Sequence, residues 1–205
     1  MRFRIYGAQL TSGATPRPYA PTAELDLIQG IGGTSTYGGN PQFVDHAVVL
    51  NKDASITLDQ TVSTDQPFAV SALIHMSGIP ARSPSAMFLK TGSVTFGINA
   101  EGVQVTADSR TYFTGAVIPP STWVHLLVAV SPTGVRVFLN GGLQAAQVPV
   151  PIPAGAASVV IAPTSTLVMQ MALFAVYQMP VTQATALHLE RDMTYKCEEL
   201  GIVRG

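Results

Sequence analysis

The stretch from residue 122 to residue 143 constrains the fold more than any other part of the chain. Its first strand-like run, WVHLLVAV, is apolar except for His125, and a run this short and apolar is typical of a strand buried on both faces. After a turn, residues 135–139 alternate so that valine and leucine share one face. Asn140 and Gly141 tolerate the left-handed backbone of a type I′ turn. The stretch therefore predicts two paired strands followed by a tight hairpin.

Further runs with strand character recur along the chain, separated by turn signals about every ten residues. They are residues 47–50, 55–58, 68–76, 87–90, 94–98, 103–106, 158–161 and 167–176. This regular spacing predicts an all-β sandwich. Residues 148–153, VPVPIP, cannot form a central strand because alternate prolines lack a backbone donor. We expect them to cross the rim of the sandwich or to bind against a neighbour.

The sequence WVHLLVAV…GVRVFLNGG resembles the core of laminin G-like, or concanavalin A-like, jelly-roll domains. The positions that carry this pattern are Trp123, His125, Phe138, Asn140 and Gly141. The resemblance extends in order over about residues 43–189 and implies a jelly-roll β-sandwich whose fold core includes Trp123, Phe138, Asn140 and Gly141. Because the family includes lectins, glycosidases, adhesion modules and virion proteins, the resemblance implies a fold rather than one function.

We expect three parts in the chain: an extended N-terminal arm over residues 1–22, the jelly-roll β-sandwich over 23–180, and a short helical tail over 181–205. The arm is rich in proline and cannot sustain a helix. In the tail, Thr182 can cap a short helix, and Thr194 can cap a second turn that ends at Gly201.

The leader YGAQLTSGAT, followed by PYAPT, resembles a segment that recurs in structural proteins of tailed bacteriophages. The resemblance implies a non-enzymatic virion protein on the capsid or tail, with a decoration, cement or adhesion role. It would be assembled in the host cytoplasm, with other virion proteins as partners and a homo-trimer or other symmetric homo-oligomer as its state. The arm residues expected to make assembly contacts are Phe3, Tyr6, Pro16, Pro18, Tyr19 and Pro21. An ordinary proline-rich leader is the alternative.

Charged residues are scarce, at 11% against about 25% in typical soluble domains. Between Thr111 and Leu189 the only charged side chain is Arg136. Such a span suggests that neighbouring molecules cover much of the surface, and a sandwich coated with Ser, Thr, Gln and Gly is the alternative. The net charge of −1 gives no electrostatic footprint for nucleic acid. No apolar run reaches the roughly 18 residues of a membrane span, and the N-terminus lacks the apolar centre of a signal peptide.

The motif from Glu24 through Asp26 to Gln29 resembles the carboxylate strand of glycosidases on this fold. A retaining glycosidase needs a nucleophile and a proton donor, and Gln29 stands where the last carboxylate would be. We therefore expect no catalytic residues and no enzyme activity. Cys197 is expected to be a buried thiol, and His125 a histidine with satisfied hydrogen bonds in the core or an interface.

No cofactor is expected, because the four histidines are scattered and form no metal-ligand pair. Calcium is possible, with carboxylate ligands from among Asp45, Asp53, Asp59 and Asp65. Sugar binding needs an exposed aromatic platform, for which the candidates in or beside loops are Tyr37, Tyr112 and Phe113. A glycan-binding module that recognises a host surface glycan is thus the alternative function.

Overall fold

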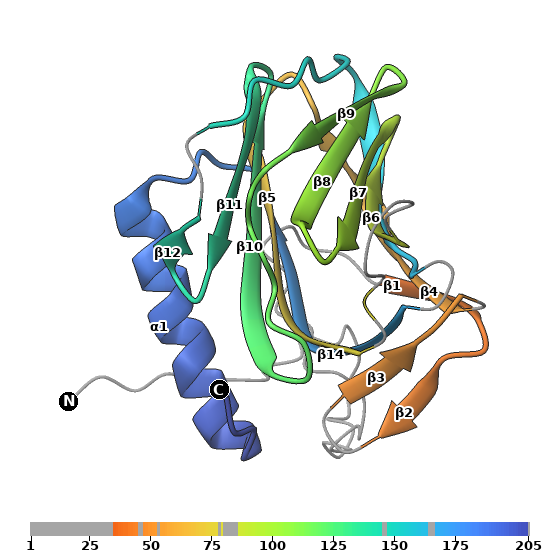
Figure 1. Ribbon diagram of the computed structural model, residues 1–205, viewed down its shortest axis with the longest axis vertical. Coiled ribbons are helices and arrows are strands. Elements are labelled where there is room, and N and C mark those ends of the chain that lie inside the picture. The colour runs from red at the N-terminus through yellow and green to blue at the C-terminus, as the bar shows by residue number, and fades with distance from the viewer. Residues whose placement is uncertain are drawn as a thin grey trace, which may run out of the picture.

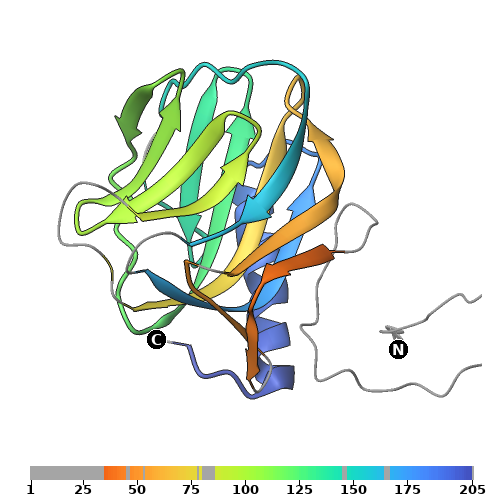
Figure 2. The same ribbon diagram turned by 90° about the vertical axis from the view of Figure 1, so that its right-hand side faces the viewer.

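The computed structural model describes residues 35–44, 47–52, 54–77, 79, 86–144, 147–163 and 167–204. Within these ranges the chain forms two antiparallel sheets and one helix, which confirms the predicted all-β sandwich (Figures 1 and 2). The predicted arm over residues 1–22 and the motif from Glu24 to Gln29 lie outside the described residues.

Each sheet has seven strands. Sheet A runs in the order β1 (Ser35–Gly39), β4 (Ala54–Ser63), β13 (Ala156–Ile161), β6 (Ala86–Thr91), β7 (Val94–Asn99), β8 (Gly102–Ala107) and β9 (Arg110–Phe113). Sheet B runs in the order β12 (Gly142–Leu143), β11 (Gly134–Leu139), β10 (Trp123–Ser131), β5 (Phe68–Ser77), β14 (Val168–Tyr177), β3 (Ala47–Leu50) and β2 (Gln42–Val44).

The helix α1 (Gln183–Leu200) lies against the outer face of sheet B, so that sheet B is the middle of three layers (Figures 1 and 2). Val128 of β10 faces the sandwich interior, whereas Leu127 packs with Phe138 and Ala186 on the helix side. Every residue from Val124 to Val130 is buried. The prediction of a strand buried on both faces is therefore confirmed, because α1 covers the second face.

The predicted Asn-Gly hairpin is confirmed. Asn140 (φ 48°) and Gly141 (φ 75°) both have left-handed backbones and connect β11 to β12, where Leu139 pairs with Gly142. Of the aromatic residues expected in the fold core, Phe138 is buried, whereas Trp123 is half-buried. Both pack on the helix side of sheet B rather than between the sheets.

The helix begins and ends at the expected caps but is continuous. The hydroxyl of Thr182 accepts a hydrogen bond from the Thr185 amide, and Gly201 (φ 68°) closes the C-terminus. The prediction that Thr194 caps a separate turn is wrong. Its hydroxyl instead donates to the carbonyl oxygen of Glu190 at 3.0 Å, four residues earlier in the same helix.

The proline-rich segment 148–153 crosses the rim of the sandwich, as predicted. Val148 forms a single bridge to Val135 at the edge of sheet B, and the chain then passes to β13 in sheet A. Val150 and Ile152 are buried along this path, so the segment also closes one end of the core.

Candidate functional site

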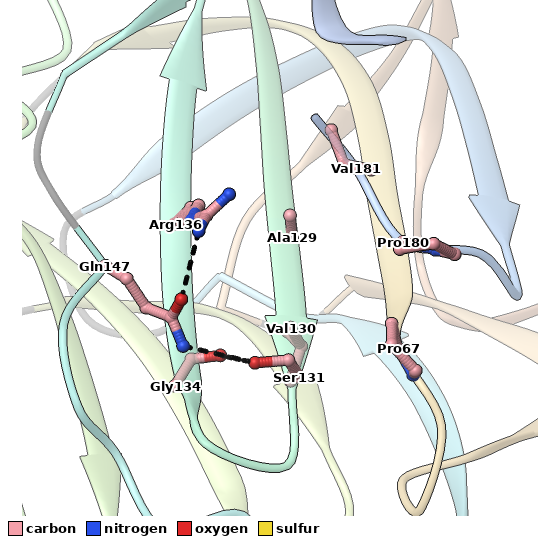
Figure 3. Close-up of a pocket in the computed structure, with 9 residues that line it drawn as sticks. All are labelled: Pro67, Ala129, Val130, Ser131, Gly134, Arg136, Gln147, Pro180 and Val181. Atoms are coloured by element: carbon pink, nitrogen blue, oxygen red, sulfur yellow. Dashed lines mark hydrogen bonds between the residues drawn. The ribbon is translucent and has the colours of Figure 1, made fainter. Parts of the chain in front are cut away.

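A pocket with a volume of about 170 Å³ opens beside the turn that joins β10 to β11 (Figure 3). One side is apolar and the other is polar. The apolar side is formed by Pro67, Ala129, Pro180 and Val181. The polar side is formed by Ser131, Arg136 and Gln147. We call this site the Arg136 pocket.

The pocket forms where the cover of α1 ends. Arg136 lies on the outer face of β11, because its neighbours Val135 and Val137 face the sandwich interior. Its cross-strand partner is Ala129, a small residue that leaves room above the sheet. Val181 directly precedes the helix cap Thr182, so the segment that leads into α1 forms this side of the pocket.

A chain of hydrogen bonds holds the polar side in place (Figure 3). A terminal nitrogen of Arg136 donates to Oε1 of Gln147 at 3.1 Å. Nε2 of Gln147 donates to the hydroxyls of Thr133 at 3.0 Å and of Ser131 at 3.4 Å. The hydroxyl of Ser131 donates to the carbonyl oxygen of Gly134 at 3.0 Å. The turn between β10 and β11 thus orients the amide of Gln147, and this amide orients the guanidinium of Arg136.

Gly134 allows Gln147 to lie this close to the turn. A Cβ atom at Gly134 would collide with the carbonyl oxygen of Val148 and would lie 3.1 Å from the side chain of Gln147. The close approach permits the backbone pair between Val135 and Val148, at 2.9 and 2.8 Å. The pocket therefore depends on a residue without a side chain at this position.

The structure does not bring the three predicted sugar-binding aromatics together. Tyr37 lies in β1, and the centroid of its ring is 5.3 Å from the centroid of the Phe43 ring. Tyr112 and Phe113 lie in β9. Strands β1 and β9 are the opposite edges of sheet A. Tyr37 and Tyr112 pack against the core, whereas Phe113 is 61% exposed.

Sequence reasoning missed the Arg136 pocket as a site. The signal that could have found it is the isolation of Arg136 as the one charged side chain between Thr111 and Leu189. The partners Gln147 and Val181 carry no local pattern that points to a site.

A second polar cluster lies between sheet B and α1 and is buried. Nε2 of His125 is 2.9 Å from the Ser71 hydroxyl, and Nδ1 is 2.6 Å from a carboxylate oxygen of Glu190. The order serine, histidine and acid is that of a hydrolytic triad. However, Ser71 is 1% exposed and His125 is 0% exposed, so a substrate cannot reach the hydroxyl. The expectation of a core histidine with satisfied hydrogen bonds is confirmed.

The same cluster continues to the C-terminal tail. Arg204 donates to Glu190 at 2.6 Å and to the side-chain oxygen of Asn140 at 2.7 Å. That oxygen also accepts from the backbone amide of His125 at 3.0 Å. Burial alone would raise the pKa of Glu190, but the hydrogen bonds and charges of His125 and Arg204 outweigh it and lower the pKa. We call Ser71, His125, Asn140, Glu190 and Arg204 the helix lock.

The described residues contain no group of three or more His, Cys, Asp or Glu side chains that could hold a metal ion. Asp65 accepts a hydrogen bond from the Gly155 amide at 2.9 Å, and Asp45 and Asp53 lie outside the described residues, as does the side chain of Asp59. Calcium therefore stays a prediction. Cys197 is 2% exposed, as expected, and burial raises the pKa of its thiol.

The part of the chain that the structure describes has no helix long and apolar enough to span a membrane.

A family described as the concanavalin A-like lectin/glucanases superfamily matches residues 50–184. No curated protein sequence is similar enough to count as a match.

Several solved structures share the fold at low sequence identity. One is botulinum neurotoxin type C, whose cell entry depends on interaction with two ganglioside molecules (TM-score 0.64, 12% identity, covering 80% of this chain and 47% of that one). Another is the binding domain of botulinum neurotoxin DC in complex with SialylT (TM-score 0.62, 11% identity, 80% and 47% covered). A third is the binding domain of Paraclostridial Mosquitocidal Protein 1 (TM-score 0.66, 11% identity, 85% and 51% covered). The chain thus spans about half the length of these structures.

Proposed function

The chain belongs to the concanavalin A-like lectin/glucanases superfamily, and from this premise we propose that it is a carbohydrate-binding module whose sugar site is the Arg136 pocket. The observation that carries the proposal is the pairing of an ordered set of hydrogen-bonding groups with an apolar wall. A sugar ring presents hydroxyls at its rim and C–H groups on its faces. Small-ligand sites of this kind are mostly apolar, with a few placed polar groups.

The size of the pocket suits one sugar residue. Its volume of about 170 Å³ lies below the roughly 300–1,000 Å³ of sites for drug-sized ligands, so the group that it takes is small. No Asp or Glu is among the described residues that line the pocket, and glycoside hydrolysis needs two carboxylates. The proposed activity is therefore binding without hydrolysis. The ganglioside and SialylT partners of the neurotoxin structures agree with a sugar ligand, although the shared fold alone does not transfer them.

The test is a screen on a glycan array followed by an NMR titration of the ¹⁵N-labelled chain with the sugars that bind. We expect amide shifts at Ser131, Gly134 and Gln147, and weaker binding by the Gln147→Ala variant. Phe113→Ala is the control, because this exposed ring lies on the edge strand β9 of the other sheet. Loss of binding in Phe113→Ala with full binding in Gln147→Ala would move the sugar site to β9. If no glycan on the array bound the protein, the proposed carbohydrate-binding function would be wrong.

A structural role in a tailed-bacteriophage virion is a second candidate, favoured by exposed apolar side chains on the edge strands. Phe43 and Val44 on β2 are 47% and 44% exposed, and Phe113 on β9 is 61% exposed. Exposed apolar edges are surfaces on which other chains can pair or pack. The relatives named above give no link to bacteriophages, so this candidate rests on these edges, on the low charge and on the resemblance of the leader.

Light scattering coupled to size exclusion tests the assembly role on the full chain and on a chain without residues 1–22. A homo-trimer or other symmetric oligomer that falls apart without these residues is the expected result. A monomer in both samples would contradict it and leave sugar binding as the proposed function.

A further inference from the structure

We infer that the Arg136 pocket selects sugars that carry a carboxylate, with the guanidinium of Arg136 as the group that binds the acid. This inference rests on the proposed function and adds to it the chemical class of the ligand. It depends on three observations, which are the charge of the site, the way Arg136 is held, and the contrast with a second arginine in the same fold.

The first observation is charge. Among the described residues that line the pocket, Arg136 is the one with a charged side chain, and its hydrogen-bond partner there is the neutral amide of Gln147. The part of the lining that the structure describes contains no carboxylate to compensate the positive charge. Because guanidinium pairs best with carboxylates and phosphates, an anionic group on the ligand supplies what the lining lacks.

The second observation is that the guanidinium is held by a neutral partner. One terminal nitrogen of Arg136 donates to Gln147, whose own amide is fixed by Thr133 and Ser131. A guanidinium has five N–H donors in a planar fork, so donors remain for a bidentate bond to a carboxylate. Since Gln147 already orients the side chain, less rotamer entropy is lost when the ligand binds.

The third observation is that Arg204, an arginine with a structural role, has different hydrogen-bond partners from Arg136. Arg204 donates to Glu190 at 2.6 Å, to Asn140 at 2.7 Å and to Thr194 at 2.9 Å. Its charge is thus compensated by a carboxylate within the helix lock. Arg136, in contrast, has a neutral hydrogen-bond partner, which is the arrangement of a binding residue.

The experiment compares acidic and neutral sugars on the full chain by NMR titration. The acidic probes are methyl glucuronide and N-acetylneuraminic acid, and the neutral probes are methyl glucoside and N-acetylglucosamine. We expect the better acidic probe to bind about tenfold more tightly than its neutral partner, as one charge-assisted hydrogen bond predicts. The comparison between the two acidic probes tells uronic acids from sialic acids. Raising the salt concentration should reduce the preference.

The variant Arg136→Gln should abolish the preference, and Arg136→Lys should keep part of it because the charge remains without the fork. Arg110→Gln, which removes the same charge from β9, is the matched control and should bind like the wild type. Equal binding of acidic and neutral sugars would overturn the inference and leave the proposed function standing. Binding of neither class would overturn both. Loss of binding in Arg110→Gln alone would place the site on β9 and overturn the assignment to Arg136.

Discussion

Gly141 lies where the β11–β12 turn meets α1. A Cβ atom here would be 2.9 Å from Cβ and 3.0 Å from Cγ of Glu190, and the backbone has φ 75°. The Asn-Gly pair predicts the turn from local sequence alone, because both residues tolerate left-handed backbones. The contact with Glu190 joins positions about fifty residues apart, so no local pattern predicts it. The glycine thus serves the hairpin and the docking of α1 together.

Gly141→Ala should therefore destabilise the protein by about 2–4 kcal/mol, the sum of backbone strain and crowding against α1. Gly115→Ala is the matched control: its φ is 72°, but a Cβ atom there meets nothing within 4 Å. In the control, the free energy of unfolding should fall only by the cost of backbone strain, about 1–2 kcal/mol. Urea denaturation of both variants measures the difference, and equal losses would show that Gly141 and Glu190 do not crowd each other.

At the scale of elements, the helix lock attaches α1 to sheet B. Glu190 receives hydrogen bonds from His125 on β10 and from Arg204 in the tail, and its side chain is 16% exposed. Removing one partner of a buried charged network leaves the other partners without compensation. The variant Glu190→Gln should cost about 2–3 kcal/mol, less than a fully buried pair because Glu190 still touches solvent. Glu199→Gln, in a surface pair with Lys196, should cost less than about 1 kcal/mol.

The helix lock also makes the stability of the folded protein depend on pH in the acidic range. The pKa of Glu190 is lowered in the folded protein from its ordinary value of 4.5, so the folded state favours the ionised carboxylate. Its contribution is complete above pH 4.5 and is lost as the pH falls through the lower folded pKa. Urea midpoints measured from pH 7 to pH 3 should fall in the wild type and fall less in Glu190→Gln. Parallel curves for the two proteins would contradict a lowered pKa at Glu190.

At the scale of the whole molecule, the sequence predicts the sandwich well and the sites poorly. Strand periodicity, turn residues and the caps Thr182 and Gly201 are local, so they can be recognised without the fold. The Arg136 pocket unites segments around residues 67, 136 and 181, and the bond between Ser71 and His125 joins residues 54 positions apart. Such contacts exist only after sheet B has paired and α1 has docked on it. A pattern along the chain therefore identifies the elements and misses the sites.

The three layers should unfold as one unit. Trp123 is the single tryptophan and packs with the cluster of Leu73 and Met193 between sheet B and α1, so its fluorescence reports the docking of the helix. Because β5, β10, α1 and the tail share the helix lock, the urea midpoint seen by fluorescence should coincide with that seen by far-UV circular dichroism. Arg204→Ala should lower both midpoints together. A fluorescence transition that precedes the loss of sheet signal would mean that α1 detaches first and that the sandwich is stable without it.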